Sequence, residues 1–448
     1  MNKIKKLLLI YFVFIVLASC SFDNKTGIWK NRSEELKVET FEENTKPIFT
    51  KVQKFKEEIS TNETVSIAPA ISNSFWSQQN FSEENFVPHF QYENQKNLIF
   101  RSKKILKKIN NESSDFEPLI IGENIILSDN GGNIYNYSFE KRNLIWKFNF
   151  YKKRFRKLPI KISFTSISEK LIVSDNLGYF YCLDINSGKI IWAQNFGIPF
   201  RSNIKIDEKF VFSLNQDNKF YGINVQDGEK ILDLETFPSF LEAEQKTNIA
   251  LDKVNKNVYF ITSTAEVYSI SYQTGAVNWI YKVTGNRTDK TIDLFFSSPI
   301  VYLDGDIILS TSSSTVSINS LSGKVNWEIQ FNTFIRPVVS KNFIFLVSRD
   351  GFVINLNKKS GKVIWSKYLF NKSKNVNEAK MGKISSINLA ADQIFLTTNK
   401  GYFLFLNYQN GEIINYAKAD RSGFFSKPSI VNKKIYIINN KGKVLVFN

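Results

Sequence analysis

The chain has 448 residues, a formal net charge of +17, two cysteines, one histidine and 15% aromatic residues. The single histidine, His89, argues against Ser-His-Asp and Cys-His catalytic sets and against a His-rich metal site. The basic residues are dispersed and no zinc-finger, helix-turn-helix or RNA-binding motif accompanies them, so we interpret the charge as a property of the surface and not as a nucleic-acid site.

Residues 1–19 have the pattern of a secretory signal peptide. Three lysines precede a 12-residue apolar run, Leu7–Ala18, which is shorter than the roughly 20 residues of a membrane-spanning helix. The run ends in LASC, which resembles the lipobox of bacterial lipoproteins and implies that Cys20 carries acyl chains such as palmitate. Ser21 in the next position implies an outer-membrane destination. An ordinary secretory signal with an incidental cysteine is the alternative.

Residues 20–74 are polar and rich in Lys, Glu, Asn and Thr, and we expect the lipidated Cys20 to be followed by a flexible periplasmic tether. The ordered domain is expected to span residues 75–448. Its first piece, SFWSQQNFSEENFVPHF from Ser74, has several aromatics without strand alternation, so we expect it to pack on the outside of the domain or over its centre. Cys182 lies within a strand-like run and is interpreted as a buried apolar residue.

A ten-residue frame, LDINSGKIIW at Leu183–Trp192, recurs along the rest of the chain. Seven copies begin at Tyr137, Leu183, Ile223, Ile270, Ile318, Leu356 and Leu406, and they are spaced 38 to 50 residues apart. Strand-like units at this period indicate a β-propeller, an array or a solenoid.

The frame has a simple physical interpretation. Its sixth position is Gly188, Gly228, Gly275, Gly323, Gly361 and Gly411 in six copies, and Arg142 in the first. Glycine in this position permits the positive φ of a hairpin turn. The tenth position is usually Trp on the last strand of the unit, where burial between units contributes about 2–3 kcal/mol.

Eight such units predict an all-β, eight-bladed β-propeller of four-stranded antiparallel blades. The anchors at the tenth position are Phe100, Trp146, Trp192, Leu232, Trp279, Trp327, Trp365 and Asn415. The first anchor strand, Asn97–Phe100, has no partners ahead of it, and the chain ends after three strands that follow Pro428. We therefore expect the N-terminal strand to complete the C-terminal blade and close the ring. Seven blades remain an alternative if one unit is out of phase.

Two connectors are longer than hairpin turns, residues 233–247 and 281–297. Both follow anchor strands of successive blades, so we expect them on the same rim, where long loops often bind partners. The candidate partner-binding residues are Phe237, Phe240, Leu241, Glu242, Asp293 and Phe295. The alternative is that these side chains, with Phe296, fold back between the blades.

The frame with Ser-Gly-Lys and Trp resembles the PQQ-like repeat, over roughly residues 97–448. With the lipobox and the eight units, the chain resembles the BamB family of lipoprotein subunits of the outer-membrane β-barrel assembly machinery. This resemblance implies a non-catalytic scaffold without a cofactor, anchored at the periplasmic face of the outer membrane, that binds BamA and assists insertion of unfolded outer-membrane proteins. The piece FPSFLEAE from Phe237 falls where that family presents a loop to BamA. Here Glu242 and Ala243 stand near the family's arginine, and the family's next acidic pair is reduced to Asp293.

Two other functions stay open from the sequence. One is a binding module for a different envelope partner or a polymer. The other is a PQQ-dependent dehydrogenase, whose repeats look alike. Such enzymes commonly have adjacent cysteines and calcium-binding acids, and this chain has neither a Cys-Cys pair nor an identifiable acidic set, so the sequence predicts no catalytic residue, cofactor or metal.

Overall fold

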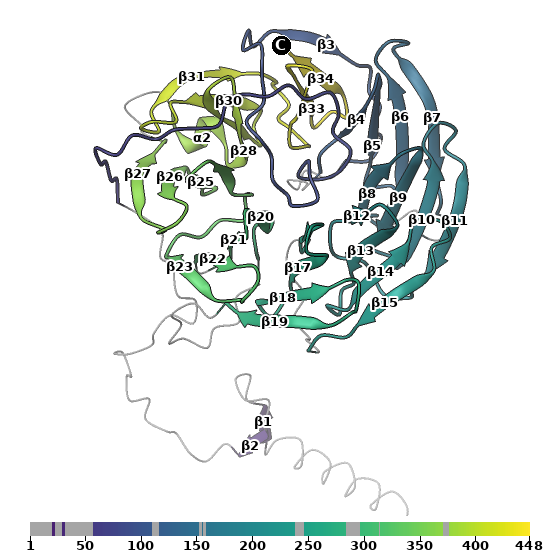
Figure 1. Cartoon of the computed structure of the whole chain (residues 1–448). Coiled ribbons are helices and arrows are strands. Elements are labelled where there is room, and N and C mark those ends of the chain that lie inside the picture. The colour runs from purple at the N-terminus through teal and green to yellow at the C-terminus, as the bar shows by residue number, and fades with distance from the viewer. Residues whose placement is uncertain are drawn as a thin grey trace, which may run out of the picture. The chain divides into compact units, whose positions relative to one another are not determined.

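The computed structural model describes residues 20–22, 29–31, 57–109, 116–151, 155, 158–237, 246–283, 296–312, 314–370 and 376–448. The chain divides into residues 1–50 and residues 51–448. In the first unit, β1 (Cys20–Phe22) and β2 (Trp29–Asn31) pair antiparallel. The second unit is a ring of four-stranded antiparallel sheets (Figure 1).

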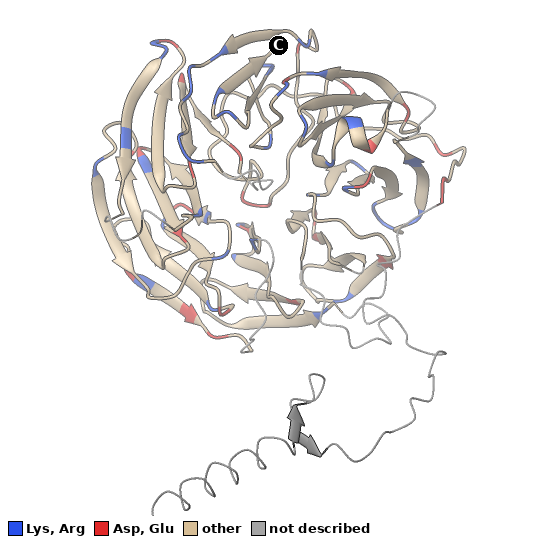
Figure 2. Cartoon of the chain, turned by 180° about the vertical axis from the view of Figure 1, so that it is seen from behind, with Lys and Arg blue, Asp and Glu red and all other residues tan. Residues whose placement is uncertain are grey.

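Each sheet of the ring, which is seen from its two sides in Figure 1 and Figure 2, is a blade. In all blades but the last, the four strands follow one another along the chain. Blade 1 is β4 (Leu119–Ile121), β5 (Asn124–Ser128), β6 (Asn133–Ser138) and β7 (Asn143–Asn149). Blade 2 is β8 (Ile162–Ile167), β9 (Lys170–Asp175), β10 (Tyr179–Asp184) and β11 (Ile190–Asn195). Blade 3 is β12 (Lys205–Asp207), β13 (Phe210–Leu214), β14 (Phe220–Asn224) and β15 (Lys230–Leu234). Blade 4 is β16 (Ile249–Asp252), β17 (Asn257–Ile261), β18 (Glu266–Ser271) and β19 (Val277–Lys282).

The second half of the ring repeats this arrangement. Blade 5 is β20 (Val301–Leu303), β21 (Asp306–Ser310), β22 (Thr315–Asn319) and β23 (Val325–Ile329). Blade 6 is β24 (Val338–Ser340), β25 (Phe343–Val347), β26 (Phe352–Asn357) and β27 (Val363–Tyr368). The short helix α2 (Glu378–Met381) precedes blade 7, which is β28 (Ile384–Ala390), β29 (Gln393–Thr398), β30 (Tyr402–Leu406) and β31 (Ile413–Lys418). Blade 8 is β32 (Ser429–Val431), β33 (Lys434–Ile438), β34 (Val444–Phe447) and β3 (Leu98–Arg101).

The ring closes through blade 8, where the N-terminal β3 pairs antiparallel with the C-terminal β34. Phe100 lies opposite Val446, and Arg101 lies opposite Leu445. The predicted eight-bladed propeller and its closure are thus confirmed, and the seven-blade alternative is wrong. Strand pairing between the two ends of the folded chain covers the outer edge of β34 and completes the last blade.

Apolar side chains of the first three strands of each blade form the core between neighbouring blades. The fourth strand is largely exposed in every blade except blade 6, where Ile364, Trp365 and Ser366 are buried. Each anchor tryptophan packs on the turn glycine of the following blade. In blade 2, the indole Nε1 of Trp192 donates to the Val225 carbonyl at 3.0 Å. A Cβ added to Gly228 would lie 2.5 Å from that ring. The glycine therefore serves both the turn and the close approach of the neighbouring indole.

The first copy of the frame shows why its glycine is dispensable. Arg142 adopts a φ of 50° there, and the preceding anchor is a phenyl ring instead of an indole. The Arg142 guanidinium lies 6.0 Å from the centre of the Phe100 ring, which is within the range of a cation–π interaction. The arginine that replaces the turn glycine therefore meets an anchor that is not tryptophan, at the junction of blade 8 and blade 1.

Residues 57–97, here called the cap segment, run across the ends of the inner strands. A hydrogen bond joins the cap segment to the first strand of each of the eight blades. The bonded pairs are Trp76–Ile120, Ser77–Ser166, Gln79–Lys205, Glu83–Leu251, Glu84–Tyr302, Ala68–Ser340, Phe90–Leu389 and Asn73–Ile430.

The cap segment corrects one boundary and decides one open question. The tether was expected to extend to residue 74, but Val65 is only 1% exposed and Gln409 hydrogen-bonds its backbone N–H at 3.1 Å. The residues after Ser74 were expected on the outside or over the centre, and their contacts place them over the centre. Trp76 is buried and donates its Nε1 to Glu117 at 3.0 Å.

Candidate functional site: the connector rim

The two long connectors emerge on the same face of the propeller. Because every blade is an up-and-down meander, the links from each fourth strand to the next first strand leave on one face, together with the turns between second and third strands. The cap segment lies mainly at the carboxyl ends of the first strands, which is the other face. This topology confirms that the connectors after β15 and β19 share a rim, here called the connector rim.

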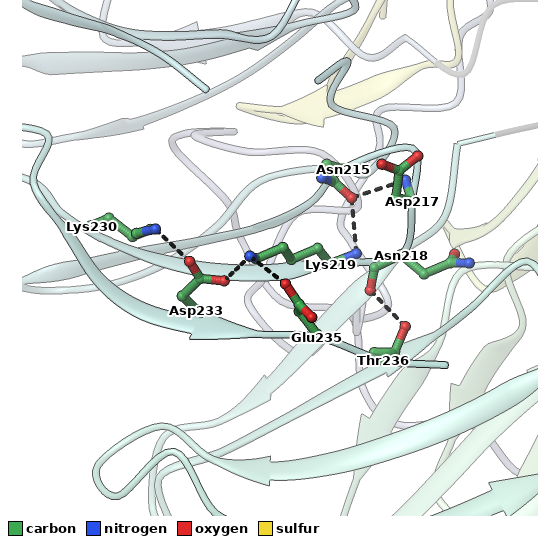
Figure 3. A network of polar contacts seen from close by, with 8 residues as sticks. All are labelled: Asn215, Asp217, Asn218, Lys219, Lys230, Asp233, Glu235 and Thr236. Atoms are coloured by element: carbon green, nitrogen blue, oxygen red, sulfur yellow. Dashed lines mark hydrogen bonds and ion pairs between the residues drawn. The ribbon is translucent and has the colours of Figure 1, made fainter. Parts of the chain in front are cut away.

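The first connector starts from a network of charged groups at the base of the rim (Figure 3). Lys219, on the turn before β14, places its ammonium 2.7 Å from Asp233 and 3.1 Å from Glu235. Lys230 makes a second ion pair with Asp233. The Thr236 hydroxyl donates to the Asn218 carbonyl at 3.0 Å. The chain is thereby held in place up to the residue before Phe237.

The charges in this network stabilise one another. Hydrogen bonds to Asp233 and Glu235 raise the pKa of the Lys219 ammonium. Partial burial tends to raise the pKa of Asp233, but the bonds from Lys219 and Lys230 outweigh it and hold that pKa below its usual value. Since these side chains are partly solvated, the network positions the connector more than it stabilises the fold.

Phe237 lies directly after this network and is 63% exposed. Burial raises the pKa of the Tyr268 phenol, and a hydrogen bond to the Phe237 backbone opposes this rise. At the other end of the connector, Lys246 donates to the Ile162 carbonyl at 2.9 Å, and Thr247 forms a bridge with Ser202. A large apolar side chain is thus presented to solvent from a connector with both ends fixed.

The second connector is also fixed at both ends. Val283 is buried and donates its N–H to the Ala265 carbonyl at 2.9 Å. Phe296 packs edge-on against Phe334, with ring centres 4.9 Å apart. The guanidinium of Arg349 lies 4.8 Å from the Phe334 ring. Phe296 therefore packs against the link between β23 and β24 and keeps some exposure.

The other proposed contact residues, Phe240, Leu241, Glu242, Asp293 and Phe295, lie outside the described residues, so of the six only Phe237 has a structural position. The anchors Phe100, Trp146, Trp192, Trp279, Trp327 and Trp365 all lie on fourth strands between blades. His89 is buried and structural in its contacts, because Nδ1 lies 2.8 Å from the Ala68 carbonyl and Nε2 accepts the Asp392 N–H at 3.0 Å.

The centre of the ring holds two buried cations that the sequence analysis did not single out. Lys205 donates to the carbonyls of Gln79 and Ser82, and Arg336 donates to Asn388 Oδ1 at 2.9 Å. Burial lowers the pKa of Lys205 to about 7 and that of Arg336 to about 10. The only available sequence signal was a lysine between two isoleucines at the start of a strand.

The profile of a family described as outer membrane protein assembly factor BamB matches residues 130–367 and 296–448, more than half of the chain. The chain belongs to this family. A protein of that description from Shewanella oneidensis is 24% identical over 192 residues, 42% of this chain and 46% of that protein. The chain thus spans about half the length of this curated relative of the BamB family, and the predicted resemblance is confirmed.

Solved structures show the same fold. BamB from Moraxella catarrhalis superposes with a TM-score of 0.60 at 14% identity, covering 79% of this chain and 99% of that one. The quinohemoprotein alcohol dehydrogenase from Comamonas testosteroni gives 0.62 at 11% identity, covering 84% and 81%. A europium-containing methanol dehydrogenase gives 0.61 at 11% identity, covering 81% and 89%. At these identities the likeness concerns the fold alone.

The dehydrogenases raise the question of whether this propeller fits a quinone cofactor and its metal ion. Among the described residues, no group of three His, Cys, Asp or Glu side chains could hold a metal ion. The buried cations Lys205 and Arg336 already donate to oxygen atoms of the chain. The described residues therefore do not fit such a cofactor, and we derive no chemistry from one. In the same described part, no helix is long and apolar enough to cross a membrane.

Proposed function

We propose that the chain is a non-catalytic scaffold subunit of the outer-membrane β-barrel assembly machinery. Membership of the BamB family supports this role. The single structural observation behind it is Phe237, exposed at the connector rim on a connector fixed at both ends. Exposed aromatic side chains on a rigid support are typical centres of protein interfaces.

In this proposal the connector rim docks on the periplasmic domains of a BamA-like protein and orients it. Phe237 supplies an apolar contact, and Phe240, Leu241, Glu242, Asp293 and Phe295 are the further candidate contact residues. The base network around Lys219 keeps the connector in place before binding, which lowers the entropy that docking costs. Orienting the BamA-like protein in this way assists the insertion of unfolded outer-membrane proteins.

The N-terminal part completes the proposal. Residues 1–19 direct export, and acyl chains on Cys20 anchor the chain to the periplasmic face of the outer membrane. The following residues, up to the cap segment, form the tether. Replacing Cys20 with Ser should abolish incorporation of labelled palmitate into the chain, and labelling of that variant equal to that of the unaltered chain would contradict a lipid anchor at Cys20.

Binding of the chain to purified BamA-like periplasmic domains tests the docking. Phe237→Asp should weaken binding by about tenfold or more, since it places a charge in an apolar contact. Leu321→Asp is the matched control, because Leu321 is 68% exposed in a turn between third and fourth strands, on the opposite face. Equal affinities of the two variants would show that Phe237 is not part of the binding site. If the unaltered chain does not bind, a different envelope partner is favoured.

A further inference from the structure

The outer strands of three consecutive blades carry pairs of exposed aliphatic residues. These pairs lie directly before the anchor in β3, β7 and β11. The three strands lie on the outer circumference of the ring (Figure 1). The pairs are Leu98 with Ile99, Leu144 with Ile145, and Ile190 with Ile191. In blades 4 and 5 the second position of the pair is Asn278 or Asn326. Blade 7 also has an aliphatic pair, Ile413 with Ile414, of which Ile414 is 55% exposed. Aliphatic pairs with at least one exposed side chain therefore gather in blades 7, 8, 1 and 2.

In blade 6 the residue directly before the anchor is buried, and the start of the cap segment docks on the same strand. The cap segment begins beside β27, where Ser60 forms an antiparallel bridge with Trp365. The N–H of Ser366 donates to the Ile59 carbonyl at 2.9 Å, and Lys367 pairs with Glu58 at 3.1 Å. Ile364, the counterpart of the exposed pairs, is 0% exposed here, compared with 44% for Ile145 and 45% for Ile191.

The same backbone groups are available on β7 and β11. By repeat position, the counterparts of Ser366 are Lys147 and Ala193, each one residue after the anchor tryptophan. They offer the backbone N–H but not the hydroxyl, which in Ser366 accepts from the Ile59 N–H and donates to the Glu57 carbonyl. Among the described strands, β7 pairs only with β6, and β11 pairs only with β10. Their outward N–H and carbonyl groups can therefore receive one more antiparallel strand.

Charge indicates the kind of strand that fits. The described part of the segment docked on blade 6 starts with Glu57-Glu58-Ile59. Residues 140–149, around β7, contain three cations and one acid, and residues 189–195, around β11, contain one lysine and no acid. An extended segment with acidic residues beside an aliphatic one would pair its charges and cover the exposed isoleucines.

We propose that the outer edges of β7 and β11 capture extended polypeptide segments of this acidic–aliphatic kind by strand addition. The choice of an unfolded outer-membrane protein as the natural occupant rests on the proposed function, whereas the site itself rests on the geometry of blade 6. Capture at the outer edges leaves the connector rim free, so one chain can hold a client strand and a docking partner together.

The test is binding of a fluorescent peptide, EEISTNETVSI (residues 57–67), to the full chain in detergent, followed by anisotropy. A double variant, Lys147→Pro with Ala193→Pro, removes the two outward N–H donors, and proline is tolerated on a strand edge. Loss of one backbone hydrogen bond at each edge should weaken binding by about fivefold or more. Glu328→Pro, at the same repeat position in blade 5, is the matched control and should bind within about twofold of the unaltered chain.

A second double variant, Ile145→Asn with Ile191→Asn, introduces the neutral residue that blades 4 and 5 have in this position. It keeps both donors and should also weaken binding, which separates apolar contact from backbone pairing. Unchanged affinity in both double variants, or no peptide binding to the unaltered chain, would overturn the inference. Both double variants should still bind the BamA-like domains. Peptide binding without BamA binding would reject the proposed function and keep this site, and the reverse result would reject only this site.

Discussion

Replacing Gly228 with Ala tests the packing that joins one blade to the next. Gly228 has a φ of +77°, and its added Cβ would lie 2.5 Å from Cε3 of Trp192. Gly275 occupies the same turn one blade later, with a φ of +75°, but its neighbour is Leu232 at 3.4 Å. The two glycines thus share the same backbone conformation and differ in the side chain that packs on them.

The magnitudes follow from this difference. A non-glycine residue in the left-handed region costs about 1–2 kcal/mol, and overpacking a close contact costs about 1–3 kcal/mol more. Gly275→Ala should therefore lower the free energy of unfolding by about 1–2 kcal/mol and Gly228→Ala by about 2–5 kcal/mol. Urea denaturation followed by far-UV circular dichroism measures both.

Changing the indole provides an internal check. Trp192→Leu, which imitates the natural pair of Leu232 and Gly275, should make Gly228→Ala no more costly than Gly275→Ala. The two changes should then show a coupling free energy of about 1–3 kcal/mol. If Gly228→Ala and Gly275→Ala cost the same in the unaltered background, the close packing of indole on glycine is not what requires glycine at this position.

Three further predictions concern the centre and the rim. Because Lys205 has a lowered pKa of about 7 in the folded state, the unfolded state binds more protons above that pH. The stability of the unaltered chain relative to Lys205→Met should therefore increase as pH rises from about 7 to about 10, and parallel pH profiles in thermal unfolding would contradict this. Asn85 lies in the cap segment and donates to the carbonyls of Ile249 and Ile300, at the start of blades 4 and 5. Asn85→Ala should lower the free energy of unfolding by about 2–4 kcal/mol in urea denaturation. A decrease below about 0.5 kcal/mol would show that these bonds do not hold the two blades together. Lys219→Met should cost less than about 1 kcal/mol yet speed protease cleavage in the first connector, and an unchanged cleavage rate would show that the base network does not hold it.

The sequence predicted the repeat fold well because each blade carries its own local signal. The turn glycine and the anchor residue lie four positions apart, so a single unit reveals both. Ring closure followed from the unpaired anchor at Phe100 and the three strands after Pro428. The partner of each anchor was harder to predict, since Trp192 meets Gly228 of the next blade instead of the glycine of its own turn.

The cap segment shows the limit of such reasoning. Its hydrogen bonds connect residues far apart in the sequence, such as Ala68 with Ser340 and Asn73 with Ile430. No local period marks these contacts, so the polar composition of residues 57–74 indicated a tether. The aromatics after Ser74 indicated order but not its location. The positions of the two long connectors after fourth strands predicted that they share one face. Exposure of Phe237 was one of two alternatives, the other being packing between the blades.

Site-specific photocrosslinking in the native cells tests the central claim most directly. A photoreactive phenylalanine analogue at position 237 should give an adduct with the BamA-like subunit of the assembly machinery. The same analogue at position 321, on the opposite face, should give none. Absence of the adduct at position 237, or equal adducts at both positions, would contradict docking through the connector rim.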